Sequence, residues 1–225
     1  MPTDAAPTPA RLIIGNRRYS SWSLRGWLAV RLAGLAVEEV MIPFTRPGPT
    51  PAIAALSPSG LVPCLEHGGA VIWESLAIAE YCAEFAPSLW PASRIARAHA
   101  RAIAAEMHAG FRALRQQMGM NLGRPDFAGR GQTAESLADV ARIEKLWGET
   151  RARFGAGGPF LFGAQFGAAD AMYAPVVTRL LTYAPPITAA TRAYCDAVRA
   201  HPLVDAWYRA AAAEPDAWLV AAYEA

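Results

Sequence analysis

The chain has 225 residues, of which 53% are hydrophobic and 18% charged, and its formal net charge at pH 7 is +2. This composition is too apolar for a disordered chain, and much of it is alanine at helical spacing, which favours a packed and largely helical globule. The basic residues form no long block, and no nucleic-acid-binding motif is found, so we expect no nucleic-acid partner. No apolar run approaches 18 residues, so we expect no membrane span.

The cysteines indicate the compartment. Cys64, Cys82 and Cys195 are widely spaced and form neither a disulfide framework nor a metal-binding pattern. The sequence therefore predicts no metal site and a reducing, cytoplasmic compartment. Residues 1–10 lack the basic and apolar regions of a signal peptide and are expected to form a disordered lead-in.

The first part of the chain mixes strands and helices. Apolar runs bounded by turn residues predict strands over residues 11–15, 37–44, 61–66 and 70–73. Helices are expected over residues 24–33, 51–56 and 74–85. The first strand, helix and second strand form a βαβ unit with parallel strands, and the last two strands form a hairpin around a turn at 67–69. This order predicts a small thioredoxin-like sheet.

The second part of the chain contains no strand candidate. After a linker at 87–93, helices are predicted over residues 93–119, 133–154, 167–183, 188–201 and 202–213. The expected fold class is α+β, with a thioredoxin-like αβ domain at 11–86 and an all-helical bundle domain at 94–225.

The first of these helices has two distinct faces. Its core face carries four apolar residues, Ile103, Met107, Leu114 and Met118. Its other face is basic and carries Arg94, Arg97, Arg101, His108, Arg112 and Arg115. We interpret the basic face as solvated; the alternative is that one or two arginines face a cleft and attract an anionic ligand.

The turn before the first helix carries the main candidates for chemistry. Ser20 and Ser21 stand where a strand gives way to a helix, and a helix start stabilises an anion through unpaired N–H groups and its dipole. The alternative interpretation is that one serine only caps the helix.

Four segments resemble the cytosolic glutathione transferases. The segment at 19–25, Tyr-Ser-Ser-Trp-Ser-Leu-Arg, is similar to the catalytic loop of the serine-type (zeta-, tau- and theta-like) classes. The segment at 61–65, Leu-Val-Pro-Cys-Leu, is similar to the family's V-P-x-L strand, and Glu74-Ser75 to the start of its glutathione-binding helix. Leu89-Trp90-Pro91 is similar to its entry into the helical domain.

This resemblance implies a role for each of these residues. Glutathione would be the co-substrate, with Ser20, and Ser21 as a second candidate, stabilising its thiolate. Glu74 and Ser75 would hold its γ-glutamyl end, Val62 would pair with its cysteinyl unit, and Pro63 would set the local geometry. The chain would conjugate glutathione to a small apolar electrophile, as in detoxification, and would form a homodimer.

The sequence also departs from some classes. Trp22 stands where the zeta class has cysteine, which argues against a maleylacetoacetate isomerase, and position 20 is not the cysteine of the omega class. Two alternatives remain open: a non-catalytic binding protein that kept the scaffold, and a glutathione-dependent peroxidase or isomerase using the same site.

Overall fold

The structure is a computed structural model that describes residues 10–44, 46–48 and 50–225. The predicted lead-in at 1–10 lies outside the described residues apart from Ala10.

The first part of the chain forms one four-stranded sheet with helices. Its strands are β1 (Arg11–Ile14), β2 (Glu38–Met41), β3 (Cys64–His67) and β4 (Ala70–Trp73), and its helices are α1 (Ser21–Leu32), α2 (Pro51–Ala54) and α3 (Ser75–Phe85). The strand order is β2-β1-β3-β4, with β1 parallel to β2 and the other two pairs antiparallel. This confirms the predicted βαβ unit and hairpin, and with them the thioredoxin-like arrangement.

The third strand is shorter than predicted. β3 begins at Cys64, so Val62 and Pro63 lie before the strand rather than inside it. The physical reason is that proline has no N–H to donate to a strand ladder. The Val62–Pro63 peptide bond is cis.

The second part of the chain is helical. Its main helices are α4 (Arg94–Ala109), α5 (Arg112–Gln117), α6 (Ala134–Phe154), α7 (Ala168–Tyr183), α8 (Ala189–Ala200), α9 (Pro202–Ala212) and α10 (Ala221–Glu224). Short 3₁₀ turns lie at Pro87–Leu89, Pro125–Phe127 and Asp216–Trp218. The α+β class is confirmed.

The predicted single helix at 93–119 is wrong, because the chain breaks it into α4 and α5. Ser93 caps α4 as expected, accepting a hydrogen bond from the Ala96 N–H. The break comes at Gly110, a poor helix former, and at Phe111, whose φ of 56° is left-handed. The predicted core residues Ile103, Met107, Leu114 and Met118 are nevertheless all buried.

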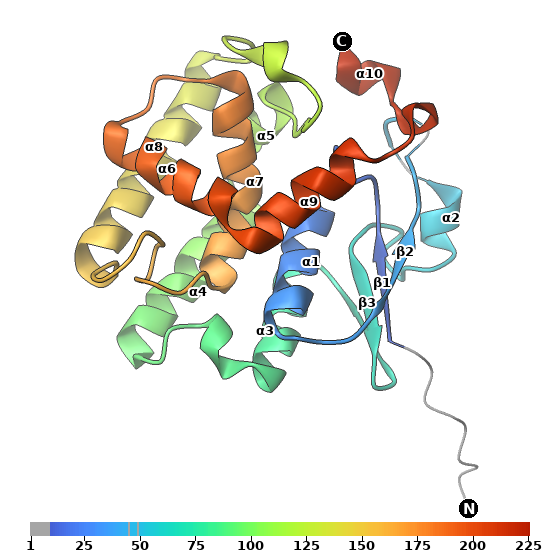
Figure 1. The fold of residues 1–225 in the computed structure, drawn as a ribbon, viewed down its shortest axis with the longest axis horizontal. Coiled ribbons are helices and arrows are strands. Elements are labelled where there is room, and N and C mark those ends of the chain that lie inside the picture. The colour runs from blue at the N-terminus through green and yellow to red at the C-terminus, as the bar shows by residue number, and fades with distance from the viewer. Residues whose placement is uncertain (1–9, 45, 49) are drawn as a thin grey trace, which may run out of the picture.

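Helix α1 joins the two parts of the chain. Figure 1 shows α1 and α3 between the sheet and the helical part, with α2 on the other side of the sheet. α1 packs against α3 and the almost wholly buried α7, and one hydrophobic core runs through both parts. Within the described residues, no helix is both long and apolar enough to cross a membrane.

Candidate functional site

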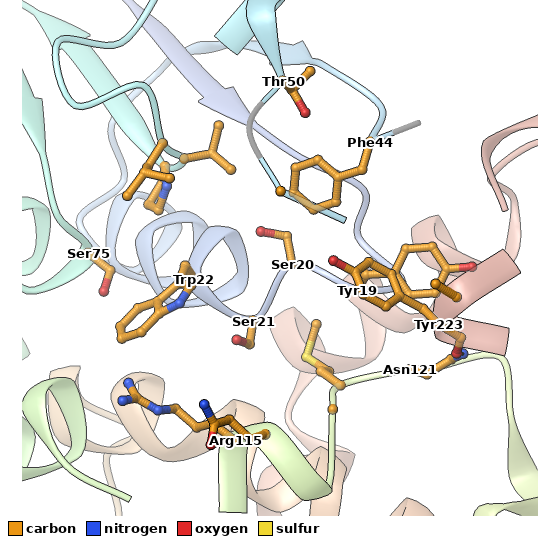
Figure 2. Close-up of a pocket in the computed structure, with 18 of the residues that line it drawn as sticks. Tyr19, Ser20, Ser21, Trp22, Phe44, Thr50, Ser75, Arg115, Asn121 and Tyr223 are labelled. Carbon is orange, nitrogen blue, oxygen red and sulfur yellow. The ribbon is translucent and has the colours of Figure 1, made fainter. Parts of the chain in front are cut away.

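One large cavity lies between the αβ part and the helical part. It has a volume of about 760 Å³ and is lined by residues of the α1 start, the segment before β3, the α3 start, α5, α7 and the C-terminal segment. Figure 2 shows Ser20 and Ser21 near its centre, with Ser75 and Trp22 on one side, Tyr223 and Asn121 on the other, and Arg115 across from the serines. The structure thus brings all six predicted site residues, Ser20, Ser21, Val62, Pro63, Glu74 and Ser75, to one cavity.

Ser20 is the N-cap of α1. Its hydroxyl oxygen accepts a hydrogen bond from the Ser23 N–H at 3.2 Å, so Ser20 caps the helix. The Ser20 hydroxyl in turn donates to the Ser23 hydroxyl oxygen at 2.7 Å, and the Ser23 hydroxyl oxygen also accepts from the Gly15 N–H. Both serines are buried, so this network fixes the position of the Ser20 oxygen at the helix start.

Ser21 occupies the first turn of α1 and has a different environment. Its hydroxyl makes no hydrogen bond with any described residue, although the residue is buried and lines the cavity. In Figure 2 both hydroxyls lie on the cavity side of the helix start. The start of α1 therefore offers two hydroxyl groups in addition to its unpaired N–H groups.

The start of α3 offers a second polar corner. Ser75 is 1% exposed, and its hydroxyl has no hydrogen-bond partner among the described residues. Glu74 has a left-handed φ of 70°, a strained conformation for a residue other than glycine, and its side chain makes no capping hydrogen bond. Neither side chain of this pair therefore caps the helix. A buried hydroxyl without a partner is costly, which indicates a site completed by a ligand.

The segment before β3 exposes backbone polar groups to the same cavity. Val62 lines the cavity, and neither its N–H nor its C=O makes a hydrogen bond with a described residue. Pro63 lies against α1 at Gly26, where a methyl group on Gly26 would be 2.7 Å from the Pro63 Cγ. Gly26 thus allows the close approach that places Val62 beside the serines.

The basic face of α4 and α5 contributes two side chains to the cavity, His108 and Arg115. The His108 Nε2 lies 3.4 Å from the Glu74 carboxylate, and burial lowers the pKa of the imidazole, with Glu74 opposing the shift. The Arg115 guanidinium lies 5.4 Å from the centre of the Trp22 ring and donates to the His108 carbonyl. Arg94, Arg97, Arg101 and Arg112 do not line the cavity, and Arg101 pairs with Glu80 instead.

Sequence reasoning missed the contributions of α7 and the C-terminal segment. Arg179 and Tyr183 of α7 line the cavity, and so does Tyr223, whose ring centre is 5.2 Å from that of Tyr19. The Tyr19 hydroxyl donates to the Glu224 carboxylate, and burial, then this contact, raises the pKa of Tyr19. No local motif marks these residues, because they reach the site only through the packing of distant helices.

The described residues hold no group of three or more histidine, cysteine or acidic side chains that could bind a metal ion. The three cysteines are buried and free, and burial raises the pKa of the Cys82 and Cys195 thiols to about 12. The polar groups available at the cavity are therefore hydroxyls, backbone groups, arginines, Glu74, His108 and the side-chain amides of Gln116, Gln117 and Asn121.

Comparisons with known proteins agree over most of the chain. Residues 19–84 match the family described as Glutathione S-transferase, N-terminal domain, and residues 97–210, just over half of the chain, match Glutathione S-transferase, C-terminal domain. A curated relative, Glutathione S-transferase L1 of Arabidopsis thaliana, is 34% identical over 99 residues. That match covers 40% of this chain and 42% of the plant protein.

Solved structures show the same fold at lower identity. A glutathione transferase homologue from Burkholderia gl BGR1, solved with bound glutathione, is 21% identical with a TM-score of 0.70 and covers 92% of this chain and 100% of that one. A theta class enzyme from Xanthomonas axonopodis pv. citri, also with glutathione bound, is 23% identical with a TM-score of 0.65 over 90% and 97% of the chains. With both of its domains matched and its fold shared, this chain belongs to the glutathione S-transferase family.

Proposed function

We propose that this protein is a glutathione transferase of the serine type, which activates the thiol of glutathione for attack on a small, largely apolar electrophile. The observation that carries the proposal is the partnerless, buried Ser75 hydroxyl, which lies on the same cavity as Ser20 and Ser21. The start of α3, with Ser75, suits the carboxylate of a peptide-like ligand. The start of α1, with Ser20 and Ser21, suits a sulfur anion and is called the serine corner below. The solved relatives with bound glutathione support this choice of ligand.

The chemical task of the serine corner is to stabilise a thiolate. A free thiol has a pKa of about 8.5, and lowering it by about two units requires roughly 2.7 kcal/mol of preferential stabilisation of the anion. A hydroxyl that donates a hydrogen bond to the sulfur at a helix start stabilises the thiolate on this scale. Ser20 is the proposed donor, and Ser21 the second candidate.

The reaction itself is a nucleophilic attack. The thiol proton leaves to water, and the sulfur electron pair forms a bond to the electrophilic carbon. In a substitution, the leaving group departs with the electron pair of the bond that breaks. In an addition to a conjugated system, the displaced electron pair takes up a proton from water.

The other end of glutathione is proposed to lie at the start of α3. Its γ-glutamyl carboxylate would accept from the Ser75 hydroxyl and from N–H groups of the helix start. Glu74 would pair with the ammonium group, and the free Val62 backbone groups would pair with the cysteinyl unit. Pro63 would hold this backbone in place.

Changing Ser75 tests this assignment. In Ser75→Ala, we expect the dissociation constant for glutathione, measured by titration calorimetry without an electrophile, to rise about tenfold or more, because a hydrogen bond to a charged group is lost. We expect the free energy of unfolding to stay level or rise, since the hydroxyl has no partner in the free protein. Ser88→Ala, at an exposed position outside the cavity, is the matched control. Unchanged glutathione affinity in Ser75→Ala would contradict the proposal.

Two further features belong to the same proposal, the division into domains and the compartment. The chain would divide into domains at 11–86 and 94–225 around a linker at 87–93, and its three buried, free cysteines suit a reducing cytoplasm.

We also propose a homodimer. Exposed apolar side chains near the β4 edge and the α3–α4 region, among them Val71, Trp73, Phe85 and Ile95, support it. Trp73→Glu should then shift the sedimentation of the protein from dimer to monomer, whereas a parent that sediments as a monomer would contradict the dimer.

A further inference from the structure

Three arginine side chains gather beside the cavity. Arg25 of α1 is 1% exposed, Arg179 of α7 is 3% exposed, and Arg115 of α5 is half-buried. The Arg25 guanidinium lies 4.5 Å from the centre of the Trp22 ring, and the Arg115 guanidinium contacts the same ring. Burial, then the charges of Arg179 and Arg115, lower the pKa of Arg25, so the three groups act on one another. Two of the three, Arg115 and Arg179, line the cavity, so positive charge is concentrated on this side of it.

No acidic group neutralises this cluster among the described residues. Arg25, Arg115 and Arg179 take part in none of the ion pairs found there, and their hydrogen bonds go to backbone carbonyls. The Arg25 Nε donates to the Met172 carbonyl, and both of its terminal nitrogens are buried without a partner. Burial lowers the pKa of Arg115 and the charge of Asp139 opposes this shift, but the two side chains form no ion pair, and the Asp139 carboxylate accepts from the Leu114 N–H. Buried charges are normally paired, so this cluster lacks an anion.

The cavity is where that anion could enter. Arg115 and Arg179 both line it. The Arg179 Nε donates to the Met118 carbonyl and its Nη1 to the Pro175 carbonyl, whereas its Nη2 makes no hydrogen bond with a described residue. Glu74 is the one acidic side chain of the described lining, and it lies beside His108. The aromatic rings of Phe127 and Tyr183, whose centres lie 5.5 Å apart, line the same cavity and offer it an apolar surface.

We propose that the electrophile of this enzyme combines a flat apolar body with a carboxylate or similar single anionic group, and that Arg115 and Arg179 bind this group. The inference rests on the proposed transferase function and names its substrate class. The anionic group takes no part in the bond changes. The glutathione sulfur forms a bond to a carbon elsewhere on the electrophile, and the leaving group departs with its electron pair. Arg115 and Arg179 are specificity-determining residues that orient the electrophile toward the serine corner.

Equilibrium binding tests the anion site without any reaction. The probes are 3,5-dinitrobenzoate and the uncharged 3,5-dinitrobenzamide, which share one ring and differ in charge. We expect the parent to bind the benzoate at least tenfold more tightly than the benzamide, and Arg115→Gln to lose most of this preference. Arg112→Gln removes the same charge from an exposed position on the same helix, outside the cavity, and should keep the preference. Equal binding of the two probes by the parent would overturn the inference.

Turnover provides the second arm. The electrophiles are 4-chloro-3,5-dinitrobenzoate and 4-chloro-3,5-dinitrobenzamide, each rate being divided by the uncatalysed rate with glutathione. The measured quantity is kcat/KM for the benzoate divided by kcat/KM for the benzamide. We expect this ratio to fall about tenfold in Arg115→Gln. It should stay unchanged in Arg179→Lys, which retains the charge. If Arg115→Gln instead lowers glutathione affinity as much as benzoate affinity, the arginines hold glutathione itself and the inference is wrong. Failure of both electrophiles to react, with the binding preference intact, would contradict the transferase function and leave the anion site supported.

Discussion

The two adjacent hydroxyls at the start of α1, those of Ser20 and Ser21, have different hydrogen-bonding environments. The Ser20 oxygen is fixed by the Ser23 N–H and the Ser23 hydroxyl, whereas the Ser21 hydroxyl has no described partner. In the free protein the Ser20 hydroxyl donates to the Ser23 hydroxyl oxygen, so donation to a bound sulfur requires the Ser20 proton to turn away from Ser23 while the heavy atoms stay in place. Capping and thiolate stabilisation are therefore compatible in one residue, and the rigid cap fixes the position of the donor.

A second residue, Asp170, governs stability rather than chemistry. Its carboxylate is buried at the third position of α7 and accepts hydrogen bonds from the Leu161 N–H, the Gly167 N–H and the Tyr194 hydroxyl. Burial, opposed by these hydrogen bonds, raises the pKa of Asp170 to about 6. Since an unfolded aspartate has a pKa of about 3.9, the folded protein holds this proton more tightly than the unfolded chain between these values.

The sign of the resulting pH dependence follows directly. The contribution of the protonated Asp170 to stability is complete below about pH 4 and is lost as the pH rises through about 6. We expect the free energy of unfolding of the parent, relative to that of Asp170→Asn, to fall by up to about 3 kcal/mol between pH 4 and pH 7. Urea unfolding of both proteins at the two pH values measures this, with Asp216→Asn as the exposed control. If the difference in free energy of unfolding between the parent and Asp170→Asn does not change with pH, the pKa of Asp170 is not raised in the folded protein.

At the scale of elements, the site depends on how closely α1 approaches the segment before β3. Gly26 of α1 faces Pro63, and a methyl group there would lie 2.7 Å from the Pro63 Cγ and 3.0 Å from its Cβ. A proline ring has no flexible end that could move aside, so either the helix or the Val62–Pro63 segment must shift.

Paired glycine substitutions test this contact. Gly26→Ala should lower the free energy of unfolding by about 1–3 kcal/mol, because the overlap outweighs the gain in helix propensity of up to about 1 kcal/mol. Gly148→Ala, inside α6 with open space around it, should instead raise that free energy by about 0.5–1 kcal/mol. Chemical unfolding of the two variants beside the parent provides the measurement. A stabilised Gly26→Ala would contradict the close approach.

The elements also show how far sequence reasoning reaches. The order of strands and helices was predictable because apolar periodicity and turn residues are local signals. The break between α4 and α5 was not, since the predicted core positions Ile103, Met107, Leu114 and Met118 keep a helical period across it. Likewise, Pro63 was predicted inside a strand that begins only at Cys64. The apolar run suggested a longer strand, but proline has no N–H to donate to a neighbouring strand.

At the scale of the whole molecule, both the αβ part and the helical part contribute residues to the cavity. Ser20, Val62 and Ser75 could be singled out from the sequence because each stands in a short motif. Arg179 and Tyr223 could not, because they reach the cavity only when α7 and the C-terminal segment pack against the αβ part. Arg115 was predictable only as one of several basic residues on a helix face. The αβ side thus carries the residues proposed to bind glutathione, while the helical side carries the groups proposed to select the electrophile.

The most direct test of the account is the titration of glutathione bound to the protein, followed by the ultraviolet absorbance of its thiolate as the pH is raised. We predict that the bound thiol titrates about two pH units below the free thiol, whose pKa is about 8.5, and that Ser20→Ala abolishes most of that difference. Calorimetric binding of glutathione to Ser20→Ala serves as the control that the site is still occupied. A bound thiol that titrates like free glutathione in the parent protein would contradict the central claim.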